Sequence, residues 1–309
     1  MVSISEVRSA NAALYSKPDL DSLTAVFIGA TNGIGLATLR AFAKHISKPT
    51  AIVIGRIRSK FEPELQNLRS INPNGTYTFL EADISLIKNI DTVCTQITSH
   101  LGSSRIDLLY TSQGYVSFAG RENNAEGLDN SIALRYYGRI RCTQNLLPVM
   151  APHARTITIL AGGQEGKIFE DDLDLEHNYS IANAAGHFAS MLSLSTDKFA
   201  EANPEKAFVH VFPGLVSTGL LGRSATGVLG YVFRWVVEPL VSLFAAKAED
   251  VGERMLYCGT SEQFEKGSWI LDADSSEKAV KVLQEYRERD MGEVVVEHNG
   301  RIFERVTAV

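Results

Sequence analysis

The stretch TAVFIGATNGIG, residues 24–35, decides the fold because a strand-like apolar run meets a glycine-rich turn there. Residues 24–29 have the β-branched and aromatic content of a buried strand, and the Ala- and Leu-rich residues 35–45 predict a helix. Gly29 allows a tight bend, Gly33 lets the backbone approach a pyrophosphate, and Gly35 lets the helix pack on the strand. The helix N-terminus then directs unpaired N–H groups at the phosphates. The turn predicts a dinucleotide site; a turn without a ligand is the alternative, which the flanking strand and helix disfavour. Three further candidate cofactor residues lie in the same turn: Thr31, Asn32 and Ile34.

The rest of the chain alternates short β-branched runs with longer helical segments. Strand-like runs occupy residues 24–29, 51–55, 76–83, 106–112, 156–162 and 207–214, and helices are expected between them, including 87–101 and about 179–202. Such alternation predicts right-handed βαβ crossovers and a buried parallel sheet. We therefore expect an α/β protein with a doubly wound, Rossmann-type parallel sheet. Residues 1–309 are expected to form one domain, with 1–23 as an N-terminal extension and 215–309 as a lid and C-terminal extension.

Composition narrows the classes of function. The net charge of −6 leaves no basic surplus for nucleic acid phosphates, so a nucleic acid partner is not expected. The three cysteines are widely spaced, and the acidic residues 171–174 have no histidine beside them, so neither a disulfide framework nor a metal site is predicted. The polar N-terminus is unlike a signal peptide, which favours a cytoplasmic protein with reduced thiols.

One apolar segment, GVLGYVFRWVVEPLVSLFAA from Gly227, needs separate interpretation. Arg234, Glu238 and Pro239 interrupt it, so it is not expected to span a membrane. We interpret residues 215–245 as an amphipathic, helical lid over an apolar substrate pocket. Contact with a membrane surface is a weaker alternative.

The end of the second predicted strand indicates which dinucleotide binds. An NAD site usually places an acidic residue there for the ribose 2′-hydroxyl, but this strand ends in GRIRSK. A guanidinium pairs well with a 2′-phosphate, so Arg56 favours NADP(H) as the cofactor. A solvated basic turn is the alternative, and it suits Arg58 and Lys60 better than Arg56.

The spacing GxxxGxG resembles the short-chain dehydrogenase/reductase superfamily, and the resemblance extends from about Thr24 to the C-terminus. EADIS after the third strand implies that Asp83 and Ile84 lie against the adenine. FPGLVSTG after the sixth strand implies that Pro213 and Gly214 lie beside the nicotinamide, with Thr218 near the carboxamide or phosphates. TSQG stands where the family has NNAG, which assigns three more residues to the cofactor: Ser112, Gln113 and Gly114.

Two longer stretches also resemble particular members of this superfamily. GKIFEDDLDL, residues 166–175, is similar to retinol-dehydrogenase-type members. The N-terminal residues 1–14 and LRYYGRIR, residues 134–141, resemble short-chain dehydrogenases of filamentous fungi, many of which serve secondary metabolism.

The substrate side departs from the family pattern. The family's active site usually contains Asn, Ser, Tyr and Lys. Here RYYG places Arg135 at the asparagine position, ILAGG leaves no hydroxyl at the serine position (residues 161–163), and YSIAN keeps Tyr179 but puts Asn183 where lysine is usual.

This altered set allows two interpretations of Arg135. In the first, Arg135 stabilises charge on the substrate oxygen or depresses the pKa of the acid, Tyr179. In the second, Arg135 turns away and forms an ion pair with the acidic residues 170–174. Asn183 can still hydrogen-bond a ribose hydroxyl. His187 shares a helical face with Tyr179, and a packing role is favoured over acid–base chemistry; His177 is a weaker candidate.

The leading hypothesis is an NADP(H)-dependent oxidoreductase that acts on a carbonyl or similar unsaturated group of a hydrophobic small molecule in secondary metabolism. The alternative is a repurposed fold that catalyses a non-redox cyclisation, isomerisation or dehydration, with the cofactor structural or absent. An inert binding protein has no positive support. A homo-oligomer is possible, although the extended C-terminus could block one of the family's usual interfaces.

Overall fold

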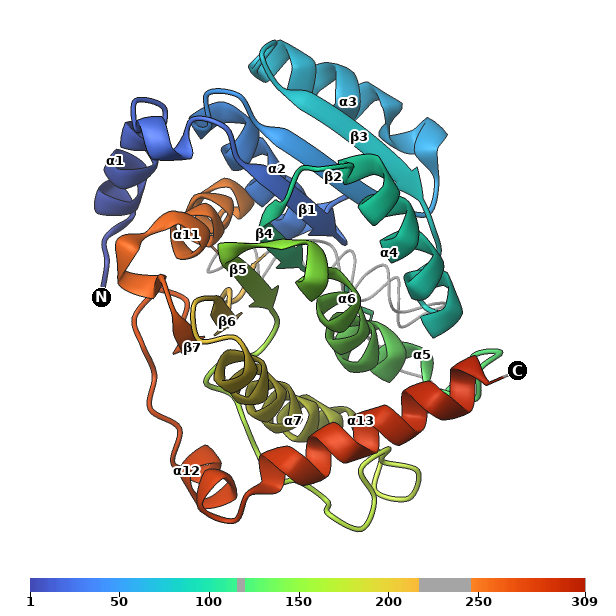
Figure 1. The fold of residues 1–309 in the computed structure, drawn as a ribbon. Coiled ribbons are helices and arrows are strands. Elements are labelled where there is room, and N and C mark those ends of the chain that lie inside the picture. The colour runs from blue at the N-terminus through green and yellow to red at the C-terminus, as the bar shows by residue number, and fades with distance from the viewer. Residues whose placement is uncertain (116–119, 217–245, 309) are drawn as a thin grey trace, which may run out of the picture.

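The computed structural model describes residues 1–115, 120–216 and 246–308. Within them, seven parallel strands form one sheet in the order β3-β2-β1-β4-β5-β6-β7 (Figure 1). The predicted doubly wound parallel sheet is confirmed. The strands are β1 (Thr24–Ile28), β2 (Thr50–Gly55), β3 (Thr76–Glu81), β4 (Ile106–Thr111), β5 (Met150–Ile159), β6 (Ala207–Val211) and β7 (Gly267–Leu271).

Helices cover both faces of this sheet. The helices are α1 (Ile4–Leu14), α2 (Gly33–His45), α3 (Arg58–Ile71), α4 (Ile87–Leu101), α5 (Asn130–Ile132), α6 (Gly138–Leu146), α7 (Ile181–Ala202), α11 (Ala248–Thr260), α12 (Lys281–Glu288) and α13 (Met291–Thr307). A π-helical turn, η2 (Ala133–Tyr137), joins α5 to α6. Short 3-10 turns are η1 (Pro18–Leu20), η3 (Leu147–Val149) and η5 (Glu262–Phe264).

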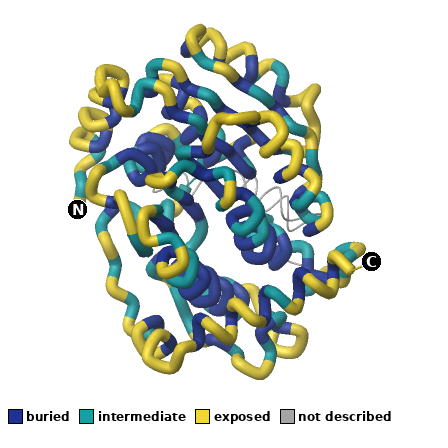
Figure 2. Tube along the Cα trace, viewed as in Figure 1, coloured by how far each residue is buried: buried dark blue, intermediate teal, exposed yellow. Residues whose placement is uncertain are grey.

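Alternation along each strand divides the core into two layers. Ala25 and Phe27 of β1 face one layer with residues of α2, α3 and α11, whereas Val26 and Ile28 face the other with residues of α4, α6, α7 and α13. Because successive strand residues point to opposite faces, a strand covered on both sides is apolar throughout. Figure 2 shows the outcome: the sheet and the inner helix faces are buried, and exposed residues lie on the outer rim.

The N-terminal segment is part of this packing. Helix α1 begins with a capping box in which Ser3 and Glu6 bond each other's backbone N–H groups. It lies against α11, where the amide of Asn11 donates to the Glu253 carboxylate at 2.7 Å. His45 of α2 contacts the same carboxylate at 3.0 Å, so one buried acid connects three helices.

The C-terminal segment adds two features that the sequence did not predict. Strand β7 extends the sheet beyond β6, with Ala207 opposite Gly267 and Val211 opposite Leu271. Helix α13 returns across the molecule and packs against α7 and α4 (Figure 1). Of the predicted lid at 215–245, almost all lies outside the described residues, and the division of the chain into one domain with a lid stays a prediction. In the described residues no helix is both long and apolar enough to cross a membrane.

Candidate functional site

A pocket of about 820 Å³ opens at the carboxyl ends of the strands. That is where an open parallel sheet binds ligands, at the point where the strand order reverses between β1 and β4. Its volume is within the usual range for small-molecule sites. The predicted residues that line it are Gly29, Thr31, Asn32, Gly33, Ile34, Gly35, Arg56, Asp83, Ile84, Ser112, Gln113, Gly114, Arg135 and Pro213.

The glycine turn has the geometry that its sequence requires. Gly29 has φ of +84°, and a Cβ there would lie 2.3 Å from the backbone nitrogen of Gln113. A Cβ on Gly35 would lie 2.2 Å from the Ser112 hydroxyl. These two glycines therefore let the turn pack against the end of β4. Asn32 caps α2, since its side chain accepts the N–H of Gly33 at 2.6 Å.

The basic residues after β2 separate into two roles. Arg58 donates to the carbonyl of Phe79 at 2.5 Å and lies 6.0 Å from the centre of that ring, so it supports β3. Arg56 is exposed, lines the pocket and makes no hydrogen bond or ion pair with the residues described here. Arg56 is thus available to a ligand, and its pairing with a 2′-phosphate stays a prediction.

Arg135 lies in the π-helical turn η2, next to the pocket. The turn closes with a bond from the N–H of Gly138 to the carbonyl of Ala133, and a Cβ on Gly138 would lie 2.8 Å from that oxygen. Such wide turns are rare and occur often at functional sites. Burial lowers the pKa of Arg135, while Tyr179 and Asp129 act in the opposite direction. The suggested ion pair with residues 170–174 is absent among the described contacts of Arg135.

The acidic segment has other partners. Glu170 pairs with Arg289 at 2.7 Å, and Asp172 accepts three backbone N–H groups from residues 176–178. Asp174 accepts the hydroxyl of Tyr137. The ion-pair interpretation of Arg135 therefore has no partner among the described residues, and an electrostatic role toward a ligand stays a prediction.

Tyr179 precedes α7 and is half-buried within electrostatic range of Arg135. Burial, and then Asp129, raise the pKa of Tyr179 and outweigh the lowering effect of Arg135. The phenol therefore keeps its proton at neutral pH. Among the described residues, Tyr179, Asn183 and Gly214 do not line the pocket, and Thr218 lies outside the described residues. Asn183 donates to the carbonyl of Asn178 at 2.8 Å, which ties it to the start of the helix.

His187 has a structural role. It is fully buried, its Nδ1 accepts the N–H of Phe169 at 3.1 Å, and its Nε2 lies 3.1 Å from the carbonyl of Leu173. Burial lowers the pKa of His187 to about 4. The packing interpretation that the sequence favoured agrees with these contacts.

The sequence did not identify Arg139 as a pocket residue, and it did not predict that the side chain of Gln113 would be buried without hydrogen bonds to described residues. Arg139 follows Arg135 by one helical turn, lines the same pocket and is 1% exposed. It donates to the carbonyls of Thr111 and Gln113 at 2.6 and 2.5 Å, which fixes the end of β4. The amide of Gln113 is buried, and neither of its polar atoms is bonded to a described residue. The four-residue spacing of the two arginines was the available signal, because it places both on one helical face.

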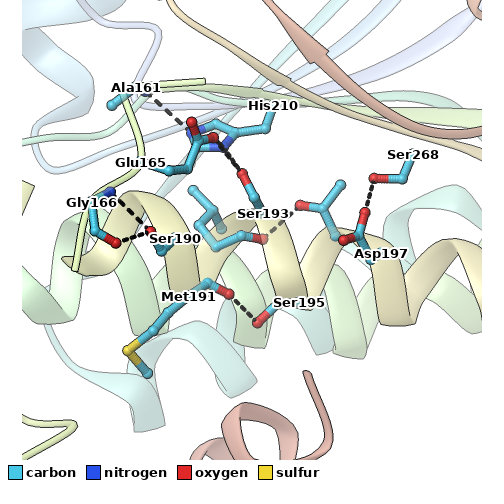
Figure 3. Close-up of polar contacts among 12 residues, drawn as sticks. Ala161, Glu165, Gly166, Ser190, Met191, Ser193, Ser195, Asp197, His210 and Ser268 are labelled. Atoms are coloured by element: carbon cyan, nitrogen blue, oxygen red, sulfur yellow. Dashed lines mark hydrogen bonds and ion pairs between the residues drawn. The ribbon is translucent and has the colours of Figure 1, made fainter. Parts of the chain in front are cut away.

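A second missed feature is a buried polar chain behind the end of β5 (Figure 3). The N–H of Ala161 donates to Nε2 of His210 at 3.2 Å, and Nδ1 of that ring lies 2.8 Å from the Ser193 hydroxyl. Ser193 in turn donates to the Glu165 carboxylate at 2.7 Å. The chain fixes the strand end where the family pattern has a serine, because Nε2 must accept and Nδ1–H must donate.

Burial sets the protonation of this chain. The Glu165 and His210 side chains have no exposed surface. Burial lowers the pKa of His210 to about 3 and raises the pKa of Glu165. One carboxylate oxygen of Glu165 is buried without a partner. None of these three side chains lines the pocket, so the group supports the site from behind.

Comparison with known proteins finds relatives among short-chain dehydrogenases and oxidoreductases, and one of them aligns over nearly the whole chain. The family model for short chain dehydrogenase matches residues 23–170. "Oxidoreductase AN1596" of Emericella nidulans is 34% identical, and the alignment covers 99% of each chain. "Short-chain dehydrogenase/reductase SAT2" of Stachybotrys chartarum is 29% identical, over 87% of this chain and 80% of that one.

A solved structure supports the fold. The NADPH-bound carbonyl reductase from chicken fatty liver superposes with a TM-score of 0.59 and 18% identity, covering 84% of this chain and 100% of that chain. At this identity the likeness concerns the fold.

Proposed function

This chain is an oxidoreductase of the short-chain dehydrogenase/reductase family, and from that premise we propose that it uses NADP(H) to reduce a carbonyl or similar unsaturated group of a hydrophobic small molecule. The observation that carries the proposal is the pocket, in which the glycine turn lies together with Arg56, which has no partner among the described residues. A place in secondary metabolism is part of this proposal, and it rests on the resemblance of residues 1–14 and 134–141 to short-chain dehydrogenases of filamentous fungi.

The residues present suit this cofactor. Gly29, Gly33 and Gly35 leave room for a pyrophosphate at the N-terminus of α2, and Arg56 offers a permanent cation for the 2′-phosphate. Ser112, Gly114 and Pro213 would line the cleft beyond the phosphates. When bound, the reduced cofactor supplies a hydride.

The chain itself would supply a proton and a positive charge. Tyr179 holds its phenolic proton at neutral pH and would donate it to the carbonyl oxygen. Arg135 cannot act as an acid, since a guanidinium stays charged, but its positive charge would attract a negatively charged or electron-rich group of the substrate. Asn183 would contribute a hydrogen bond near the ribose only if its contact with Asn178 opens.

Cofactor choice can be tested by thermal unfolding with NADPH or NADH. We expect NADPH to raise the melting temperature more than NADH, because only NADPH carries the 2′-phosphate that Arg56 would bind. Arg56→Gln should weaken NADPH binding about tenfold or more, with little effect on NADH. Lys60→Gln is the matched control, an exposed cation on the same segment. Equal stabilisation by both dinucleotides would contradict the proposal.

The non-redox alternative has one observation in its favour. Among the described residues, neither Tyr179 nor Asn183 lines the pocket, so the usual proton relay is not assembled there. NADPH oxidation with a panel of apolar ketones and enones separates the two functions. Binding of NADPH without turnover of any member would favour the non-redox reaction.

A further inference from the structure

The described residues that line the pocket include three guanidinium groups, of Arg56, Arg135 and Arg139, and one carboxylate, of Asp83. Arg135 of η2 and Arg139 of α6 both line it. Among the described residues, Arg139 donates to neutral groups, the carbonyls of Thr111 and Gln113 and the Thr111 hydroxyl, and its buried Nε has no partner there. Arg135 forms no hydrogen bond or ion pair with any described residue.

Asp129 is the acid whose field acts on Arg135. Its two oxygens already accept backbone N–H groups, from Ile132 at 2.9 Å and from Glu122 at 2.8 Å. It therefore serves as the cap of α5 and is not paired with a guanidinium in the described contacts. Arg135 and Arg139 carry two positive charges and Asp129 carries one negative charge, so these three residues leave an excess positive charge.

A cation withdrawn from water without a counter-ion is costly, so its presence calls for a negative partner. A guanidinium presents parallel N–H groups whose spacing matches the two oxygens of a carboxylate. Gln113 adds a buried amide with both polar atoms unbonded beside the same space. Leu134, Ile159 and Leu160 give the lining an apolar part, beside the polar side chains of Asn130 and Tyr115.

We propose that the substrate carries a carboxylate on an apolar body, and that Arg135 binds this carboxylate as a two-pronged pair. Arg139 lies behind it and adds positive potential without touching the ligand's charge directly, since its own donors hold the end of β4. The inference rests on the proposed function, because the ligand is a substrate only if the protein is the proposed reductase. It deepens that proposal by naming the substrate class.

Isothermal titration with 3-phenylpropanoate and its neutral isostere 3-phenylpropanamide tests the proposal, with and without NADP⁺. The wild-type protein should bind the carboxylate about tenfold or more tightly than the amide, because a charge-assisted pair is lost with the amide. Arg135→Gln should abolish that preference, and Arg135→Lys should retain part of it. Arg8→Gln removes an exposed arginine of α1 and should leave the preference unchanged.

Each outcome decides one question. Equal binding of the two probes by the wild type, or an undiminished preference in Arg135→Gln, overturns the carboxylate assignment. If Arg135→Gln weakens NADPH binding as much as it weakens the carboxylate, the arginine serves the nucleotide phosphates and the assignment is again overturned. If the wild type binds no NADPH, the proposed function fails, while the carboxylate preference measured without nucleotide still tests this inference. Should Arg135→Gln unfold, Arg135→Lys decides: a preference as large as the wild type's would contradict the two-pronged pair.

Discussion

At residue 135 the chain has a permanent cation where the family pattern has a neutral amide, and the local backbone is built around it. The wide turn needs Gly138, because a Cβ would lie 2.8 Å from the carbonyl that closes the turn. The sequence predicted the change of residue but not the turn, since a π-helical hydrogen bond leaves no mark in hydrophobic periodicity. The sequence also could not show that Arg135 lacks a partner among the described residues, because the acidic residues suggested for it pair with Arg289 and Tyr137 instead.

Tyr179 gives the first residue-scale prediction. Tyr179→Phe removes the phenolic proton but keeps the ring that packs against the core. We expect kcat to fall by about 100-fold or more, which is typical when a general acid is lost, while NADPH binding is unchanged. Stopped-flow measurement of hydride transfer provides the readout. Full turnover in the variant would remove Tyr179 from the mechanism.

The buried histidines predict how stability depends on pH. The pKa of His210 falls from 6.5 to about 3 on folding, and that of His187 to about 4. Between pH 6.5 and about 4 the unfolded chain binds protons that the folded chain refuses, so stability is present above pH 6.5 and is lost as the pH falls. The raised pKa of Glu165 acts in the opposite direction over part of this range.

His210→Gln tests this linkage, since glutamine can still accept from Ala161 and donate to Ser193. The loss of unfolding free energy between pH 7 and pH 5 should be smaller in this variant by about 2 kcal/mol. Urea titrations at both pH values measure it. His177→Gln, at an exposed position, is the control. Equal pH dependence in wild type and His210→Gln would contradict the neutral, buried assignment of His210.

At the scale of elements, the packing of β6 against the segment after β5 limits which residues can stand there. A Cβ on Gly162 would lie 2.2 Å from the carbonyl oxygen of His210, so β6 approaches too closely for any side chain. The neighbouring Ala161 is partly exposed and already carries a Cβ. Strand packing therefore excludes a hydroxyl-bearing side chain at residue 162, one of the three positions (161–163) where the family pattern would place its serine.

This packing predicts different costs for two serines. Gly162→Ser should destabilise the protein by about 1–3 kcal/mol or more, because backbone must move to admit the new atoms. Ala161→Ser should cost much less. Urea unfolding of both variants at neutral pH makes the comparison. Similar stabilities would show that the two strands can separate at little cost.

The elements differ in how well the sequence predicted them. The helix expected at 87–101 coincides with α4, and the first four strands agree within two residues. Strand β5 begins at residue 150 instead of 156, because its first residues are polar or, like Pro152, unfavourable in a strand and so gave no strand signal. The pairing of β5 with β4 also shifts register in this part. Strand β7 was missed because five residues, two of them Gly and Ser, carry little strand signal outside the sheet. The chain of Glu165, Ser193 and His210 joins positions 28 and 17 residues apart, which no local pattern relates.

For the whole molecule, the C-terminal helix α13 supports the site from a distance. The Tyr136 hydroxyl donates to Asn299 at 3.0 Å, and the Tyr137 hydroxyl lies 2.8 Å from Nε2 of His298. Both tyrosines belong to η2, the turn that presents Arg135, and both are buried. Helix α13, which begins at Met291, thus holds the turn η2, which begins more than 150 residues earlier at Ala133.

Asn299→Leu tests this support with little change of volume. It leaves the buried Tyr136 hydroxyl with a weaker set of partners, so unfolding free energy should fall by about 1–3 kcal/mol. If η2 depends on α13, the variant should also lose preference for 3-phenylpropanoate over the amide, while NADPH affinity stays unchanged because the glycine turn lies on α2. Glu297→Gln, at an exposed position of the same helix, should alter neither property. A loss of stability with an intact carboxylate preference would mean that α13 serves the fold but does not position Arg135, and a parallel loss of NADPH binding would mean that the whole pocket depends on it.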